Sequence, residues 1–548
     1  MKRTFLYVCL LMVSLSLSAQ DGNGYLTGSF ENTTHYYVED KQTGALYRED
    51  PFGSNNYLKL DYHKGKFSAG MQMEGYLPLT VGYPNELTGV NLSNLYATWR
   101  DDNFSITAGT FYEQFGSGLL FRTWEDRMLG LNNAVVGARF TWNYEDILSF
   151  KALWGLPRYG MGIFTNNTSR ANTLTNTNTQ VRGADLSFSI SSLAGWDATY
   201  LALEGSVLNR CETGLNADLL AEGGKSSTTG WSGRVNFEKS GFFLKAEYVD
   251  AGDKYYQTPV SSDVFYLKKK GNAQLVELGY NGRGLGVTLT GRRLEYMNLD
   301  IISGDGSSSN MMNYAPAMCT QYTYMLTTMH PYSAQLYYLT GAFSNSGEMG
   351  GQIDAFYNFR RGTALGGKRG MKVHANFSTY YAIAQEGTFN PGNLLFRDFS
   401  FDVEKQFSKE FKMMLLYSHQ NYNDSYGADP SDVFIQNIVV ADLLYKFTSK
   451  FSTRLELQYL ATRQDKGDWM AALLEVNFAP HWSVFASDMF NHGSTKIHYY
   501  NAGVSYAKSR TRIAVGYGRY KEGKLCSGGV CRNIPAYTGA NFSITTSF

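Results

Sequence analysis

The chain has 548 residues, a net charge of +1, 43% hydrophobic and 15% aromatic residues, with 56 Gly and only 11 Pro. The near-zero charge and the absence of a basic stripe exclude nucleic-acid recognition. After the first twenty residues no run of eighteen apolar residues occurs, which excludes a helical membrane span. Segments of about ten residues with period two recur between turns instead, and this is typical of a membrane β-barrel.

The N-terminus has the features of a secretory signal. Lys2 and Arg3 precede an apolar run from Phe5 to Val13, and small residues end at Ala19. The apolar run is too short to span a bilayer. We therefore predict a signal peptide at residues 1–19 and a barrel at residues 20–548.

The first notable connection spans residues 113–131, between alternating segments at 105–112 and 133–141. It is too polar for a core and too apolar for a plain solvated loop. We predict that it folds into the barrel lumen, where Phe115, Leu119, Leu120, Phe121 and Trp124 pack together and the charged residues pair with one another or with wall charges such as Arg139. The alternative is an exposed surface loop. The candidate lumen residues are Glu113, Phe115, Gly116, Gly118, Phe121, Arg122, Trp124, Glu125, Asp126 and Arg127.

The wall strands are predicted from strict alternation. From Phe451 to Tyr459 the odd positions are Phe, Thr, Leu, Leu and Tyr, and the even positions between them are Ser, Arg, Glu and Gln. A soluble sandwich also alternates, but the number of such segments and the alternation of short turns with long connections favour a barrel. The predicted long connections include residues 157–179, 210–227 and 250–271. The inward positions are Lys59, Asp61, Arg234, Glu238, Lys245, Glu247, Arg292, Arg454 and Glu456, of which Lys245, Glu247, Arg292, Arg454 and Glu456 are the lumen-wall candidates. Their mixed sign indicates either weak charge selectivity or a salt-bridge network that stiffens the wall.

Two later connections are also distinctive. Residues 296–347 are rich in Met, Tyr and Ser and carry only Asp300 and Asp305 among Asp, Glu, Lys and Arg. Because flexible solvated loops are usually richer in charge, this segment is predicted to pack against the lumen or a partner protein. Cys526 and Cys531 in the last long loop are predicted to form a disulfide, whereas the pairing of Cys211 and Cys319 stays open.

The C-terminus alternates and ends on an aromatic residue. Phe542, Ile544 and Phe548 share one face, as a closing strand read by the outer-membrane insertion machinery would. Counting all segments predicts about 24 strands, between about 20 and 26, in one all-β antiparallel barrel with short periplasmic turns, long extracellular loops and no N-terminal plug domain. Such a ring is roughly 45–50 Å across, so water or inward loops must fill it.

Three blocks of sequence resemble a family of bacterial outer-membrane barrels that is classed as a domain of unknown function. They are residues 109–140, Pro331–Tyr332 and residues 366–378. The resemblance covers most of the chain after residue 20. It implies the fold and an outer-membrane location, and it brings no assigned activity or ligand.

The function we predict is a porin-like passive channel for polar solutes, narrowed by the two inward loops. The alternative is a non-conducting barrel that serves as a scaffold or accessory subunit of an envelope assembly and meets an envelope protein partner. No enzyme is expected. The eight His residues are scattered without metal-ligand spacing, and His492-Gly493-Ser494 falls in a predicted turn without a third catalytic group. No cofactor and no metal are predicted.

Overall fold

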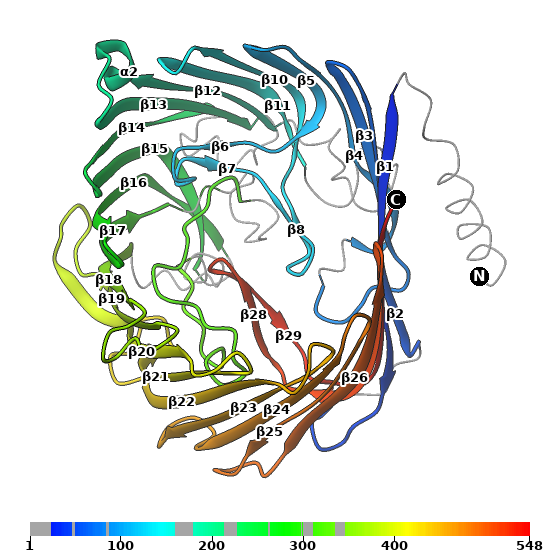
Figure 1. The fold of residues 1–548 in the computed structure, drawn as a ribbon. Coiled ribbons are helices and arrows are strands. Elements are labelled where there is room, and N and C mark those ends of the chain that lie inside the picture. The colour runs from blue at the N-terminus through cyan, green and yellow to red at the C-terminus, as the bar shows by residue number, and fades with distance from the viewer. Residues whose placement is uncertain are drawn as a thin grey trace.

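Twenty-four antiparallel strands form one sheet that closes on itself (Figure 1). The computed structural model describes residues 24–45, 50–83, 87–158, 179–212, 227–260, 263–297, 299, 311–334 and 346–548. The predicted signal peptide at 1–19 lies outside these residues, as do 159–178 and 213–226 of two predicted long connections. In the described part of the chain, no helix is long and apolar enough to cross a membrane.

The wall strands pair with their neighbours in chain order. The first group is β1 (Tyr25–Val38), β2 (Phe52–Lys64), β3 (Phe67–Tyr76), β4 (Gly89–Arg100), β5 (Phe104–Phe111), β10 (Val135–Tyr144), β11 (Leu148–Pro157) and β12 (Thr179–Ser189). After the short helix α2 (Ile190–Ala194), the second group is β13 (Thr199–Glu212), β14 (Ser227–Lys239), β15 (Phe242–Val260), β16 (Asp263–Gly282), β17 (Leu285–Glu295), β18 (Gly347–Phe359) and β19 (Met371–Ile383). The third group is β20 (Pro391–Gln406), β21 (Phe411–Asn423), β22 (Val433–Lys446), β23 (Phe451–Thr462), β24 (Trp469–Phe478), β25 (Trp482–Asn491), β26 (His498–Lys508), β27 (Thr511–Tyr520) and β30 (Tyr537–Ser547).

The last strand closes the barrel. β30 pairs with β27 on one side and with β1 on the other, from Ser29↔Ser547 to Val38↔Thr538. The three C-terminal candidates lie at this seam. Phe542 and Ile544 are in β30, and the ring of Phe548 lies against Gly28, where a Cβ would be 2.4 Å from it. The predicted fold class and a strand number of about 24 are confirmed.

The two faces of the wall differ in the way that alternation predicts. Leu457 of β23 is 46% exposed on the outer face, whereas its neighbour Glu456 is 5% exposed on the inner face. At the rim with the short turns, aromatic rings form a continuous row across β21 to β24, with centroids 4.7–6.4 Å apart. The row is Phe407, Phe411, Tyr445, Phe447, Phe451 and Phe478. An apolar outer band bordered by aromatic residues is the surface of a transmembrane barrel.

One predicted connection is wrong. We expected a long loop at residues 250–271, but β15 continues to Val260 and β16 begins at Asp263, paired along this whole stretch. The polar residues that indicate a loop are paired across the hairpin instead. Lys270 binds Asp250 at 2.7 Å and Lys268 binds Asp253 at 3.0 Å. Both ion pairs are diagonal across the two strands, since Asp253 itself faces Lys270. Opposite charges on neighbouring positions of paired strands stabilise a sheet, so a charged stretch here extends the wall.

Candidate functional site

Three segments that connect wall strands at the long-loop rim lie inside the ring (Figure 1). The first lumen segment is residues 113–133 and contains β6 (Gln114–Phe115), β7 (Phe121–Arg122), β8 (Glu125–Asp126) and β9 (Leu131–Asn132). The second lumen segment is residues 311–334, the green trace that crosses the ring in Figure 1. The third lumen segment is residues 523–534, the hairpin of β28 (Gly523–Ser527) and β29 (Val530–Ile534). The sequence did not place this third segment inside the barrel.

The apolar residues of the first lumen segment are buried together. Phe115, Leu119, Leu120 and Phe121 are at most 1% exposed, and the rings of Phe115 and Phe121 lie 5.2 Å apart. Their cluster includes wall residues and the second lumen segment: Phe111, Val135, Val181, Leu208, Val249, Met312 and Ala315. Burial of each such side chain stabilises by about 1.5–3 kcal/mol, so this segment is fixed to the wall.

The glycines of the first lumen segment allow a close approach to the wall. Gly116 has φ +53°, and a Cβ there would lie 2.6 Å from Cδ of Arg234 and 2.8 Å from Oε1 of Glu247. Ser117 donates its backbone N–H to Oε2 of Glu247 at 3.2 Å. Gly118 has φ +94°. Glycine is therefore required at position 116 both for its backbone conformation and for space.

Glu113 begins the first lumen segment between two wall cations. Its Oε1 accepts from Nζ of Lys151 at 2.9 Å, and its Oε2 lies 3.4 Å from Nη1 of Arg139. The Glu113 side chain is 9% exposed. The predicted pairing of this segment's charged residues with the wall residue Arg139 is therefore present, through Glu113.

Arg127 ties the other end of the segment to the wall. Its guanidinium binds Glu31 at 2.8 Å and Glu125 at 3.2 Å, and lies 4.5 Å from the ring centre of Tyr57. Burial lowers the pKa of Arg127, but the two carboxylates outweigh burial and raise that pKa above its ordinary value. Asp126 accepts the backbone N–H three residues later at 3.1 Å.

Trp124 does not join the cluster in which we expected it. It packs instead with Met311, Tyr314 and Val530, which belong to the second and third lumen segments. The guanidinium of Arg122 lies 4.0 Å from the ring centre of Tyr314 and 5.0 Å from that of Trp124. The chain leaves the β6–β7 pairing after Arg122, so Trp124 is turned away from Phe115 and toward the other segments.

Four hydrogen bonds to backbone carbonyls link the first and second lumen segments. Two come from backbone N–H groups, Arg122 to Met312 O at 2.8 Å and Tyr314 to Gly118 O at 2.9 Å. Two come from side-chain amides, Asn313 Nδ2 to Leu119 O at 3.1 Å and Asn133 Nδ2 to Met311 O at 2.6 Å. Buried backbone groups need such partners. The two segments therefore form one unit.

The second lumen segment binds wall carboxylates through its tyrosines. Tyr322 donates to Asp402 at 2.7 Å, and Tyr324 donates to Asp442 at 3.2 Å. Burial and these carboxylates raise the pKa of both phenols, which keeps the phenols protonated as donors. This explains why a segment poor in charge is rich in tyrosine: neutral donors satisfy an acidic wall.

Tyr332, in the Pro331–Tyr332 block, is stacked between two wall rings. Its ring centre lies 4.9 Å from that of Tyr380 and 4.8 Å from that of Phe396, and its hydroxyl donates to Glu348. Glu348 in turn binds Arg292 at 2.7 Å. Tyr332 therefore anchors the end of the described part of the second lumen segment.

The third lumen segment joins the other two. Cys526 and Cys531 form a disulfide across the hairpin. At its tip, the C=O of Gly528 accepts from the Tyr314 hydroxyl and that of Gly529 from the Ser333 hydroxyl. Arg532 then reaches the first lumen segment, donating to the C=O of Met128 at 2.9 Å. A Gly-Gly pair between two cysteines indicates a hairpin, but nothing local in the sequence indicates its partners.

The five lumen-wall candidates all lie on the inner face. Arg292 binds Glu348, Arg454 binds Asp442 and Glu456 at 2.8 Å each, Glu247 accepts from Ser117, and Lys245 lies 4.0 Å from Glu277. The sequence missed a further pair, Arg158 with Glu74 at 3.1 Å, in which both side chains are almost fully buried. Cys211 and Cys319 are free thiols. Among the described residues, no group of three or more His, Cys, Asp or Glu is arranged to hold a metal.

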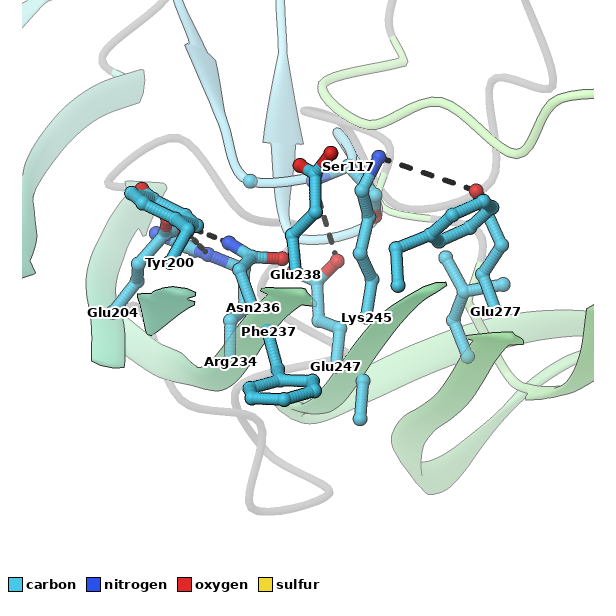
Figure 2. A pocket seen from close by; sticks show the side chains of 14 residues that line it. Ser117, Tyr200, Glu204, Arg234, Asn236, Phe237, Glu238, Lys245, Glu247 and Glu277 are labelled. Atoms are coloured by element: carbon cyan, nitrogen blue, oxygen red, sulfur yellow. Dashed lines mark hydrogen bonds and ion pairs between the residues drawn. The ribbon is translucent and has the colours of Figure 1, made fainter. Parts of the chain in front are cut away.

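A pocket of about 450 Å³ lies between Gly116–Ser117 and the inner face of β13 to β16 (Figure 2). Figure 2 shows Arg234 and Asn236 turned toward Glu204 at one side, Lys245 extending to Glu277 at the other, and Glu238 and Glu247 between them. This pocket lies close to the short turn at Ser240–Gly241, so it is on the short-turn side of the first lumen segment.

Comparison with protein families shows what kind of chain this is. The chain matches, over residues 1–548, the model of a family of unknown function, DUF6029, and it belongs to that family. The resemblance inferred from the three sequence blocks is confirmed. Comparison with curated proteins yields no match.

Comparison with solved structures finds matches of low identity, among them a translocation pore, a siderophore receptor and a porin. The P pilus usher (PapC) translocation pore has 9% identity and a TM-score of 0.42, with 95% of this chain and 99% of that chain covered. The siderophore receptor PirA from Pseudomonas aeruginosa has 10% identity and a TM-score of 0.41, covering 95% and 80%. A mutant of the Rh. blastica porin has 13% identity and a TM-score of 0.28, covering 60% and 95%. At these scores no function is transferred.

Proposed function

We propose that this protein is an outer-membrane channel for polar solutes, constricted by its three lumen segments. The observation that carries the proposal is that charged side chains inside the ring are exposed. The Lys245 side chain is 60% exposed and its ammonium lies 4.0 Å from Glu277, and the Lys59 side chain is 42% exposed although it binds Asp61 at 3.3 Å. An ammonium group that no tight ion pair satisfies requires water, so the lumen beside the lumen segments is hydrated.

The apolar outer face and aromatic row support a location in the bacterial outer membrane, with lipid as the surrounding partner. In that orientation the short turns face the periplasm and the long connections face outside. The strand β30 and Phe548 at the closing seam support recognition by the insertion machinery during assembly. The candidate residues of the first lumen segment then narrow the path, and the wall candidates line or stiffen it.

The test is conductance in a planar lipid bilayer. The second lumen segment can be removed without breaking the pairing of β17 with β18, because Glu295 and Gly347 are register partners and Tyr296 N–H bonds to Ser346 O at 2.9 Å. Joining residue 296 to residue 346 by a two-residue turn is expected to increase the single-channel conductance. The matched control shortens the turn at residues 361–369, which joins the register partners Phe359 and Met371 at the opposite rim.

Steady conductance of the intact chain, larger after the lumen deletion and unchanged after the rim deletion, supports the channel. Silence of the intact chain and of the lumen deletion, with both folded, overturns it and favours the non-conducting scaffold. Equal conductance in all three chains overturns constriction by the second lumen segment.

A further inference from the structure

The pocket below Gly116–Ser117 has an unbalanced charge. Its lining carries four carboxylates, Glu204, Glu238, Glu247 and Glu277, and two cations, Arg234 and Lys245. The charge of Arg234 is already balanced, because its guanidinium binds Glu204 at 2.7 Å and also Asp185, which does not line the pocket. Negative charge therefore remains on the surface of the pocket that faces the lumen.

Glu247 provides a second, independent indication that this pocket binds a ligand. Its residue is only 7% exposed, and while Oε2 accepts from Ser117, Oε1 has no hydrogen-bond partner. A buried carboxylate oxygen without a donor is costly. Glu238 is exposed and has no ion pair within the described residues, so a second carboxylate beside Glu247 is open to a ligand.

Lys245 shows which chemistry fits this space. Its ammonium lies 4.0 Å from Glu277 and 5.7 Å from the ring centre of Phe243. The pocket thus already holds one primary ammonium between a carboxylate and an aromatic face. That contact is long and exposed, and such a pair contributes little stability, so the Lys245 side chain can yield its place to a ligand.

We infer that this pocket binds small organic cations that carry primary ammonium groups. Its volume of about 450 Å³ admits a diamine with room for water, and Glu277 on one side with Glu238 and Glu247 toward the middle offer carboxylates to more than one ammonium group. The inference rests on the proposed function for access of the solute through the lumen, and it names organic cations as a class of solute that the channel holds on its way. At this pocket the wall then attracts cations through its carboxylates, although the charge of the wall as a whole is mixed.

The experiment is calorimetric titration of the full-length protein in uncharged detergent with 1,4-diaminobutane. The neutral 1,4-butanediol and the anion succinate are the matched probes. The variant E238Q/E247Q is expected to bind the diamine at least tenfold more weakly. A second variant, E238Q/E277Q, keeps the Glu247–Ser117 contact and guards against loss of the first lumen segment. E404Q, a wall glutamate paired with Lys412 at 3.0 Å on β20 and β21, is the control and is expected to bind like the unchanged chain.

Diamine binding that is weakened in both double variants and kept in E404Q supports the inference. Equal binding by all variants, equal binding of the diol, or tighter binding of succinate overturns it. Bilayer conductance of the same preparations separates the two proposals. A barrel that conducts but binds no diamine overturns only the pocket, and one that binds the diamine but never conducts overturns only the channel.

Discussion

At the scale of single residues, the buried charges of the lumen serve to position the lumen segments. Arg292 and Glu348 are 1% and 2% exposed, and they also bind Pro316 and Tyr332 of the second lumen segment. Removing one member of a buried pair costs about 3–5 kcal/mol, because the other charge is left without compensation. Of the two interpretations of the mixed wall charge, a stiffening network fits these buried pairs, and in the proposed channel charge selectivity would have to come from the exposed groups.

His330 provides a prediction about pH. Its Nδ1 lies 3.2 Å from the side-chain oxygen of Gln436, and its ring packs against Tyr422 and Phe434. Burial lowers the pKa of His330 below its ordinary value, and the charge of Lys521 adds to this, although Asp465 opposes it. The unfolded pKa is about 6.5. Because the pKa of His330 is lower in the folded state, the neutral ring contributes its full stability to the fold above pH about 6.5. This contribution is lost as the pH falls through the folded pKa.

We therefore expect the second lumen segment to loosen at acid pH. Amide hydrogen exchange of residues 322–334, corrected for its intrinsic pH dependence, should be faster at pH 5 than at pH 8. The variant His330→Gln keeps a polar side chain but does not titrate, and it should show no such difference. A pH effect of equal size in that variant would assign the titration to another group.

At the scale of elements, the hairpin of β28 and β29 holds the lumen segments together. Its tip contacts the second lumen segment and Arg532 contacts the first, so its loss would affect both. Among the glycines of this hairpin, Gly529 makes the closest approach to the second lumen segment. It has φ +92°, and a Cβ there would lie 2.4 Å from the backbone N of Ala317.

Gly529→Ala is expected to displace the hairpin tip at a cost of about 1–3 kcal/mol, from backbone strain and from the clash together. Limited proteolysis or hydrogen exchange of residues 311–334 should then increase. Gly523→Ala is the matched control in the same hairpin, because the nearest atom to a Cβ there is Nζ of Lys521 at 3.9 Å. Unchanged protection of residues 311–334 in the Gly529 variant would contradict the role of the tip.

The elements also show what the sequence can and cannot predict. Residues 451–459 alternate, and alternation reports which face of a strand meets lipid, so β23 and most wall strands were predictable. The composition of residues 113–131 and 296–347 was also informative, because the first segment is too apolar and the second too poor in charge for a solvated loop. The contact of Ser333 with Gly529 joins residues 196 positions apart and follows from packing inside a closed ring, which leaves no periodic signal. The same holds for the pocket, which forms only where Gly116 and Ser117 lie against four neighbouring wall strands, β13 to β16.

At the scale of the whole molecule, the fold depends on one seam. Within the described residues, every other strand pairing of the wall joins strands that follow one another along the wall, whereas β1 and β30 bring its two ends together. A closed sheet leaves no unpaired edge in the membrane, where unsatisfied backbone groups are costly. A strand number of about 24 was predictable, because alternation marks the strands one by one from Tyr25 to Phe548. The exact register of the seam was not, since shifts by two residues preserve the inward and outward faces.

The register of the seam can be tested by cross-linking. Thr33 and Ser543 are direct partners, and opposite residues of antiparallel strands have Cα atoms about 4.5–5.5 Å apart, within the range of a disulfide. In a chain with Cys211 and Cys319 replaced by serine, T33C/S543C is expected to cross-link on mild oxidation. The heat-denatured, unreduced product should migrate differently on electrophoresis, because the bond closes nearly the whole chain into a ring. T33C/S547C, displaced by four residues, should stay open, since Ser547 is the partner of Ser29. Cross-linking of the displaced pair alone would show another register, and failure of both pairs in a folded chain would show that the barrel does not close at this seam.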